Sequence, residues 1–138
     1  MLSTDELYRI ADENGITIVS GDLPLCGSCS FPLNDEQCVV GIDKTRIVSS
    51  ADEKTKIAHE IGHCMKYAFY NRYSRFDIVS RHEYRADKWA IENVIPKDEM
   101  ISAMKSGLVE TWQLAEFFDV SENLVKRAMW IYFDKEIA

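Results

Sequence analysis

The sequence predicts an α+β fold in which a small antiparallel sheet packs on a helical core and further helices follow toward the C-terminus. The chain has 138 residues, of which 46% are hydrophobic, so it can bury one substantial core. Short β-branched segments bounded by Gly, Pro and Asn occur only in the first third. Capping residues and helical apolar spacing dominate the rest. We expect a core over residues 1–95 and a helical segment over 96–138 packed on it.

The first third contains one predicted helix and three predicted strands. Residues 3–6 form a capping box, and the helix that follows is expected to stop before Gly15. Residues 16–20 are short and β-branched, which is typical of a strand. The Gly-, Pro-, Ser- and Cys-rich residues 21–30 indicate a loop. Two more strands are expected at 31–33 and 37–42, and Pro32 favours an edge position for the former.

The next predicted helix carries two of the three histidines of the chain. Residues 50–53 (Ser-Ala-Asp-Glu) form a second capping box, and an apolar stripe marks the buried face. Residues 59–63 read His-Glu-Ile-Gly-His. Because positions four apart stack on one helix face, His59 and His63 can share one metal ion. Glu60 lies beside them, where it can accept a proton from a water on that metal. Gly62 suggests a close approach of another backbone or of substrate.

A third metal ligand is predicted on the following helix, at residues 81–94, which is expected to end near Pro96. Catalytic zinc usually has three protein ligands and one open position. Glu83 and Asp87 share one helix face, so Glu83 can complete a His₂Glu site while Asp87 accepts a hydrogen bond from a histidine, expected to be His59. The alternative is that residues 80–83 form a capping box, which would turn Glu83 away from the metal.

Composition excludes several partners and predicts a compartment. The net charge of −7 argues against bulk electrostatic binding to nucleic acid or an anionic membrane. No apolar run is long enough to span a bilayer, and the first residues lack signal-peptide features, so we expect a cytoplasmic protein. Free thiols are therefore expected at all four cysteines, although the Cys-x-x-Cys pair at 26–29 could hold a structural zinc or do redox work. These cysteines are Cys26, Cys29, Cys38 and Cys64.

These motifs, in this order, resemble the ImmA/IrrE family of metallopeptidases. The resemblance rests on His59-Glu60-Ile61-Gly62-His63, on residues 83–90 (Glu-Tyr-Arg-Ala-Asp-Lys-Trp-Ala) and on Val94-Ile95-Pro96, and it covers roughly residues 15–130. It implies a zincin-like fold, Zn²⁺ ligands at His59, His63 and Glu83, and Glu60 as catalytic acid/base. It also implies cleavage of a partner helix-turn-helix repressor by phage, mobile-element or stress-response proteins. The segment at 26–29 is not a mark of this family.

The C-terminal third contains its own helix-turn-helix-like pattern. Residues 96–106 predict a helix that stops at Gly107. Residues 114–125 have the spacing of a helix-turn-helix, with Asp119 where glycine is common. Residues 107–138 hold three basic and six acidic side chains, which disfavours direct DNA binding. A packing module, or a surface that docks the repressor, is the better interpretation.

The sequence therefore predicts a zinc-dependent, gluzincin-like endopeptidase. An additional donor to the developing oxyanion is expected. The candidates, which the sequence does not rank, are His82, Tyr70, Tyr73 and Tyr84. Two rival functions remain. One is a metal-stabilised regulator that binds a repressor without cutting it, and the other is a DNA-binding regulator that acts through residues 112–130.

Overall fold

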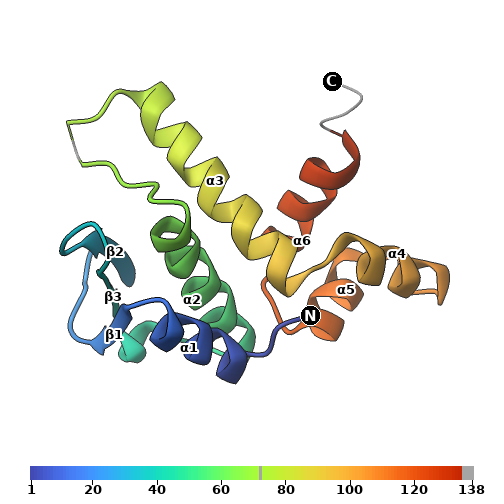
Figure 1. Cartoon of the computed structure of the whole chain (residues 1–138). Helices are drawn as coiled ribbons and strands as arrows, with labels where there is room; N and C mark the ends of the chain where they lie inside the picture. Colours follow the sequence, from blue (N-terminus) through green and yellow to red (C-terminus); the bar gives the residue numbers. More distant parts are fainter. Residues whose placement is uncertain (72, 135–138) are drawn as a thin grey trace.

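The computed structural model describes residues 1–71 and 73–134 and confirms the predicted α+β class. The sheet lies at one end of the molecule, α4, α5 and α6 lie at the other, and α2 and α3 run between them (Figure 1). The elements are α1 (Thr4–Glu13), β1 (Ile16–Ser20), β2 (Ser28–Pro32), β3 (Cys38–Ile42), the 3₁₀ turn η1 (Lys44–Arg46), α2 (Ser50–Met65), α3 (Phe76–Val94), α4 (Lys97–Lys105), α5 (Thr111–Phe118), α6 (Glu122–Met129) and the π-helical turn η2 (Trp130–Asp134).

Side-chain caps define where the first two long helices begin. The Ser3 hydroxyl accepts a hydrogen bond from the backbone N–H of Glu6, as the capping box predicts. Helix α2 begins one residue earlier than expected, because Ser49 rather than Ser50 is the N-cap and accepts from the N–H of Asp52 at 3.1 Å. This shift leaves the register of the histidines within the helix unchanged.

The sheet is mixed, not mainly antiparallel as the sequence suggested. Its order is β1-β3-β2, with β1 parallel to β3 and β2 antiparallel to β3. Each strand runs opposite to the strand before it in the sequence, so β1 and β3 run in the same direction. Because β3 lies between β1 and β2 in the sheet, it pairs in parallel with β1 and antiparallel with β2. Strand β2 also starts earlier than predicted. Cys29 and Ser30, which were expected in a loop, are strand residues paired with Gly41 and Val40.

The core lies where β3, α1, α2 and α3 meet. Fully buried side chains from all four elements pack there: Leu7, Val40, Ile42, Ile57, Ile61 and Ile91. Burial of each contributes roughly 1.5–3 kcal/mol relative to exposure. Helix α2 therefore has a fixed rotation about its axis. Its other face, which carries His59 and His63, points toward β2 and α3.

Gly62 allows α2 and α3 to approach closely. A Cβ at Gly62 would lie 2.5 Å from the carbonyl oxygen of Ala86 on α3, so no larger residue fits without a shift of one helix. This is the close backbone approach that the glycine indicated. The two helices lie side by side along most of α2 (Figure 1).

Helix α3 starts at Phe76, five residues before the predicted start at residue 81. Residues 76–80, which precede the expected helix, are therefore helical as well. Glu83 lies within the helix rather than at its beginning, so its assignment as a capping residue is wrong. Its carboxylate instead bonds to side chains of neighbouring elements.

Two of the four cysteines form a disulfide, which contradicts the prediction that all four are free. Cys38 at the start of β3 is bonded to Cys64 near the end of α2, with 6.1 Å between their Cα atoms. The pair is 26 residues apart and carries no local spacing signal, and the prediction rested only on the expected compartment. Cys26 and Cys29 are free thiols, as predicted.

The C-terminal helices have the predicted helix-turn-helix spacing. Asp119, between α5 and α6, adopts the left-handed conformation with φ of +53°, which explains why glycine is common at such a position. Helix α6 packs on α3. The proposed boundary at residue 95 stays a prediction. Among the described residues, no helix is both long and apolar enough to cross a bilayer.

Candidate metal centre

His59, His63 and Glu83 converge at the crossing of α2 and α3. The Nε2 atoms of the two histidines are 3.1 Å apart. Glu83 places Oε2 2.9 Å from His59 Nε2 and Oε1 3.3 Å from His63 Nε2. Tetrahedral zinc with bonds of 2.0–2.2 Å separates its ligand atoms by about 3.3–3.5 Å. The three ligand atoms thus have nearly the spacing that such an ion requires, and within the described residues they form the one group with this property.

The remaining ring nitrogen of each histidine has a hydrogen-bond partner. His59 Nδ1 donates to Asp87 Oδ1 at 2.8 Å, and His63 Nδ1 donates to the carbonyl oxygen of Ala68 at 2.6 Å. The second bond depends on Tyr67, whose φ of +47° turns the chain back after α2 and brings Ala68 over His63. These bonds orient both rings so that both Nε2 atoms face one point, where a shared metal ion could bind them.

The charges of this cluster couple His59 and Glu83. Burial lowers the pKa of His59, but hydrogen bonds to Asp87 and Glu83 outweigh it and raise the value to about 10. Burial raises the pKa of Glu83, and its bonds to His59, His63 and Tyr70 overcome this and hold the pKa well below its ordinary value. The metal-free site thus stores a proton on His59 between two carboxylates. A metal cation would displace this proton.

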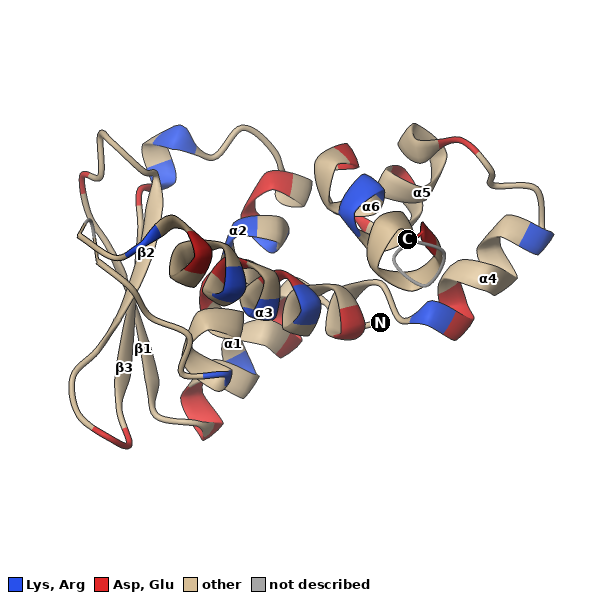
Figure 2. Ribbon diagram, turned by 90° about the horizontal axis from the view of Figure 1, so that it is seen from above, with Lys and Arg blue, Asp and Glu red and all other residues tan. Residues whose placement is uncertain are grey.

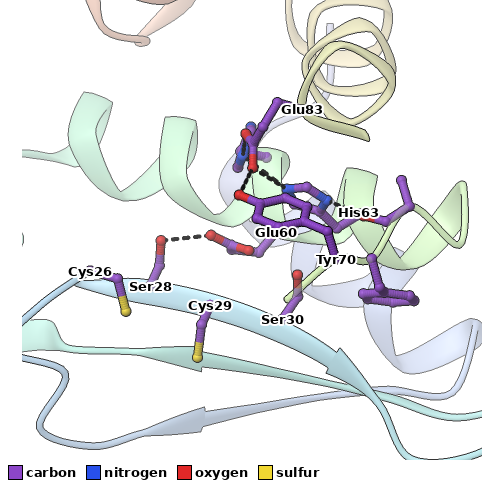
Figure 3. Close-up of a pocket in the computed structure, with 11 residues that line it drawn as sticks. Cys26, Ser28, Cys29, Ser30, Glu60, His63, Tyr70 and Glu83 are labelled. Atoms are coloured by element: carbon purple, nitrogen blue, oxygen red, sulfur yellow. Dashed lines mark hydrogen bonds and ion pairs between the residues drawn. The ribbon is translucent and has the colours of Figure 1, made fainter. Parts of the chain in front are cut away.

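Glu60 lies on the side of the histidines that faces β2. It is 6% exposed, and its Oε2 accepts a hydrogen bond of 2.8 Å from the Ser28 hydroxyl (Figure 3). Ser28 is the first residue of β2, and the side chains of Ser28 and Ser30 project from the strand toward Glu60 and the histidines. The edge strand thus provides one wall of the site and the contact that holds the Glu60 carboxylate.

An open cavity of about 280 Å³ lies over the cluster, bounded by β2 on one side and by the chain that follows α2 on the other. Tyr70 is the one of the four proposed oxyanion donors that lines it, and its hydroxyl donates to Glu83. His82 stacks on Tyr70 with ring centroids 6.5 Å apart, and its buried Nδ1 has no hydrogen-bond partner among the residues that the structure describes. Tyr84 packs against Trp130 instead, and Tyr73 is 79% exposed.

The C-terminal helices contact the metal site through Asp87. Arg127 on α6 places Nε 3.4 Å from Asp87 Oδ2, the carboxylate oxygen that does not contact His59. The guanidinium lies over the rings of Trp130 and Tyr84, at 4.9 and 5.8 Å from their centroids. The segment after residue 96 therefore helps to orient the metal-binding face of α3.

The structure brings together the two histidines, the two glutamates and Asp87 that the sequence assigned to the metal site, and it adds Ser28, the Ala68 carbonyl and Arg127. Ser28 could have been found from the alternation of Ser28 and Ser30 on an edge strand, had the predicted strand been extended back to residue 28. The carbonyl of Ala68 and the side chain of Arg127 have no sequence signal. Both depend on how the chain returns to α2 and α3 in space.

The site has the composition of a metallohydrolase site. It combines two histidines of one helix, a glutamate of a second helix and a buried glutamate beside an open cavity. Comparison with known families narrows this class. The model of the IrrE N-terminal-like domain, peptidase family M78, matches residues 11–129, so the chain belongs to this family, as its motifs indicated. Its function is accordingly of the metallopeptidase type, with a protein as substrate. No curated protein and no solved structure matches the chain.

Proposed function

We propose that the protein is a zinc-dependent endopeptidase that cleaves a partner helix-turn-helix repressor and so derepresses phage or mobile-element genes. The observation that carries the proposal is the convergence of three ligand atoms, all within 4.8 Å of one another, beside Glu60 and an open cavity. A structural zinc site would instead be closed by a fourth protein ligand. Within the described residues the cluster has three, and the cavity adjoins it.

In this proposal His59, His63 and Glu83 hold Zn²⁺, and Asp87 orients His59 through the bond to Nδ1. The metal, when bound, supplies an activated water and polarises the scissile carbonyl. Glu60 accepts the proton of the attacking water and transfers it to the leaving amine. The contact from Ser28 leaves the other carboxylate oxygen, Oε1, available for this proton transfer.

Tyr70 is the proposed donor to the developing oxyanion. Burial, together with the bond to Glu83, raises the pKa of its hydroxyl above the ordinary value of 10, so the group keeps its proton at neutral pH. When Glu83 binds the metal, the Tyr70 hydroxyl becomes available to a substrate oxygen in the cavity. Tyr70→Phe should therefore lower kcat, by up to about 10²–10³-fold, with a smaller effect on KM.

The substrate is proposed to bind as an extended strand along the free edge of β2. This strand pairs with β3 on one side and, among the described residues, has no ladder on the other. Apolar side chains are exposed at its C-terminal end, with Phe31 at 47% exposure and Leu33, the residue after the strand, at 59%. Backbone hydrogen bonds of an added strand supply affinity, and such side chains favour an apolar segment.

The rival without proteolysis differs from this proposal in the role of Glu60. A regulator that only holds its repressor needs the metal cluster and the docking surface but no proton acceptor. The other rival, a DNA-binding regulator, needs basic residues on α5 and α6. Lys and Arg residues are instead spread over several elements (Figure 2), and among the described residues of α6 they number two.

The test is incubation of the zinc-loaded protein with the repressor encoded beside its gene, with mass spectrometry of the products. The matched control is Glu60→Gln, which should abolish fragments while zinc content and repressor binding stay unchanged. Fragments from Glu60→Gln would refute the assigned mechanism. Repressor binding with no fragments from either protein would support the non-proteolytic regulator. Salt-sensitive binding to a specific duplex would support the DNA-binding rival.

A further inference from the structure

The segment Cys26-Gly27-Ser28-Cys29 places two free thiols on either side of the residue that contacts Glu60. Ser28 donates to Glu60 at 2.8 Å, and Cys26 and Cys29 line the same cavity as Glu60 and the histidines. The two sulfur atoms lie across β2 from the serine hydroxyls (Figure 3). Any change in the Cys26–Cys29 pair therefore acts on the backbone that carries Ser28.

The surroundings of the pair favour a reversible bond between the two sulfurs. Only two residues separate Cys26 from Cys29, and both free thiols belong to residues that line one cavity. Gly41, the partner of Cys29 in the sheet, makes room for its sulfur, because a Cβ at Gly41 would lie 3.2 Å from Cys29 Sγ. Gly27 has φ of +73°, which permits the tight turn between the cysteines.

The two thiols differ in access. Cys26 is exposed, whereas Cys29 is half-buried. Burial, followed by the neighbouring Cys26, raises the pKa of Cys29 above its ordinary value. Since the thiolate is the nucleophile, the accessible Cys26 is the thiol that a reagent in solution meets first, and Cys29 is placed to react second.

We propose that Cys26 and Cys29 are a redox-active dithiol, a modification site for small disulfides such as oxidised glutathione, and that its oxidation lowers peptidase turnover by displacing Ser28 from Glu60. The effect on turnover rests on the proposed function. The dithiol itself does not.

The reaction is thiol–disulfide exchange in two steps. The Cys26 thiolate attacks one sulfur of the small disulfide, breaks its S–S bond and releases one small thiol. Cys29 then loses its proton, attacks Cys26 Sγ and releases the second small thiol. Two thiols of the protein thus become one disulfide, and the small disulfide takes up the two electrons and two protons. Excess small thiol reverses both steps.

Closing this ring moves the residues that it contains. A disulfide brings its sulfurs to about 2.05 Å, closer than two free thiols can approach, and restricts the Cβ atoms to about 3.5–4.5 Å. Ser28 is one of the two residues inside the ring, and a shift of about 1 Å takes its hydroxyl out of hydrogen-bond range of Glu60. Misplacement on this scale costs up to about 10²-fold in rate. We expect kcat to fall at least about threefold while KM changes less.

The experiment exposes the zinc-loaded protein to graded ratios of oxidised and reduced glutathione and measures two quantities. Mass spectrometry of the fragment that holds Cys26 and Cys29 should show a loss of about 2 Da, reversed by reduced glutathione. Cleavage of the repressor should fall in parallel and recover. Cys26→Ser and Cys29→Ser should each abolish the mass loss and the redox response, each variant being compared with its own reduced form.

Ser28→Ala separates the proposed route from simple obstruction of the cavity. It should have lower kcat when reduced and should form the disulfide normally, but oxidation should change its kcat by less than about twofold. Ser28→Thr, which keeps the hydroxyl, should restore part of the turnover and of the redox response. A full redox response in Ser28→Ala would overturn the role of Ser28.

Other outcomes also decide between the proposals. Failure to form the disulfide within residues 26–29, or a second zinc equivalent that disappears in Cys26→Ser, would overturn the dithiol. An oxidised protein with unchanged turnover would overturn its control of the site. If the reduced wild-type protein cleaves nothing, the proposed peptidase function and the effect on turnover both fail, whereas the mass loss still establishes the dithiol.

Discussion

Gly62→Ala should destabilise the protein although it replaces glycine inside a helix with the best helix former. Helix propensity alone predicts a gain of about 1 kcal/mol. The new Cβ would lie 2.5 Å from the Ala86 carbonyl oxygen, about 0.9 Å short of ordinary van der Waals contact at 3.4 Å. The obstacle is backbone, so α2 and α3 must separate. Overpacking of this kind costs about 1–3 kcal/mol, and we expect a cost near 3 kcal/mol because the backbone carbonyl cannot move aside as a side chain could. We expect a net loss of about 2 kcal/mol.

The same separation should weaken the metal site, because Glu83 moves with α3 while His59 and His63 stay with α2. Metal–ligand distances tolerate only about 0.2 Å, so zinc affinity should fall at least about tenfold. Denaturant unfolding of the metal-free protein and chelator competition measure the two effects. Gly21→Ala is the control, since nothing lies within 4 Å of a Cβ there and little change is expected. A Gly62→Ala protein that is more stable than wild type would refute the reasoning.

Three further changes test the surroundings of the site. Asp87→Asn should weaken zinc binding by about 10–100-fold, and Arg127→Met, which acts through Asp87, should weaken it less. If both variants bind zinc as tightly as the wild-type protein, neither contact orients His59. Because zinc displaces the proton of His59, zinc affinity should rise as pH increases from 6.5 to about 10, and a pH-independent affinity would contradict this. The metal-free protein should lose stability over the same pH range, since the raised pKa of His59 stabilises the folded state only while the ring is protonated. Cys38→Ser removes a disulfide that links residues 26 positions apart, and it should lower the free energy of unfolding in non-reducing urea by about 3 kcal/mol. After reduction, the variant and the wild-type protein should have the same free energy of unfolding.

The part of the site that lies within one helix could be predicted from sequence. Residues four apart on a helix share a face whatever the fold, so the positions of His59, His63 and Glu60 followed from the motif alone. To assign Glu83 as a ligand, the sequence would also have had to reveal where α3 begins. Five residues of that helix precede residue 81 without a recognisable side-chain cap, since Arg75 makes no such hydrogen bond. The capping alternative for Glu83 therefore could not be dismissed from the sequence.

The parts that the sequence did not reveal depend on contacts between distant segments. The parallel pairing of β1 with β3 and the disulfide between Cys38 and Cys64 are both non-local. The start of strand β2 was missed for a local reason. Its Ser-Cys-Ser start lacks the large β-branched residues that mark strands, because one face of it lines a polar cavity. A functional requirement thus overrode the propensity on which the prediction relied.

The helix-turn-helix pattern of α5 and α6 is explained by the support that these helices give to the metal centre. Leu124, Val125 and Ala128 of α6 are buried, which uses the apolar face of the helix for packing within the protein. Arg127 then extends from α6 to Asp87, whose other oxygen binds His59. A guanidinium that pairs with this carboxylate and lies over the rings of Trp130 and Tyr84 is poorly placed to contact a phosphate. The spacing that is typical of a DNA-binding module therefore also fits a helix that supports α3. A repressor that docks on α6 would contact the helix whose Arg127 holds Asp87, and Asp87 in turn orients His59.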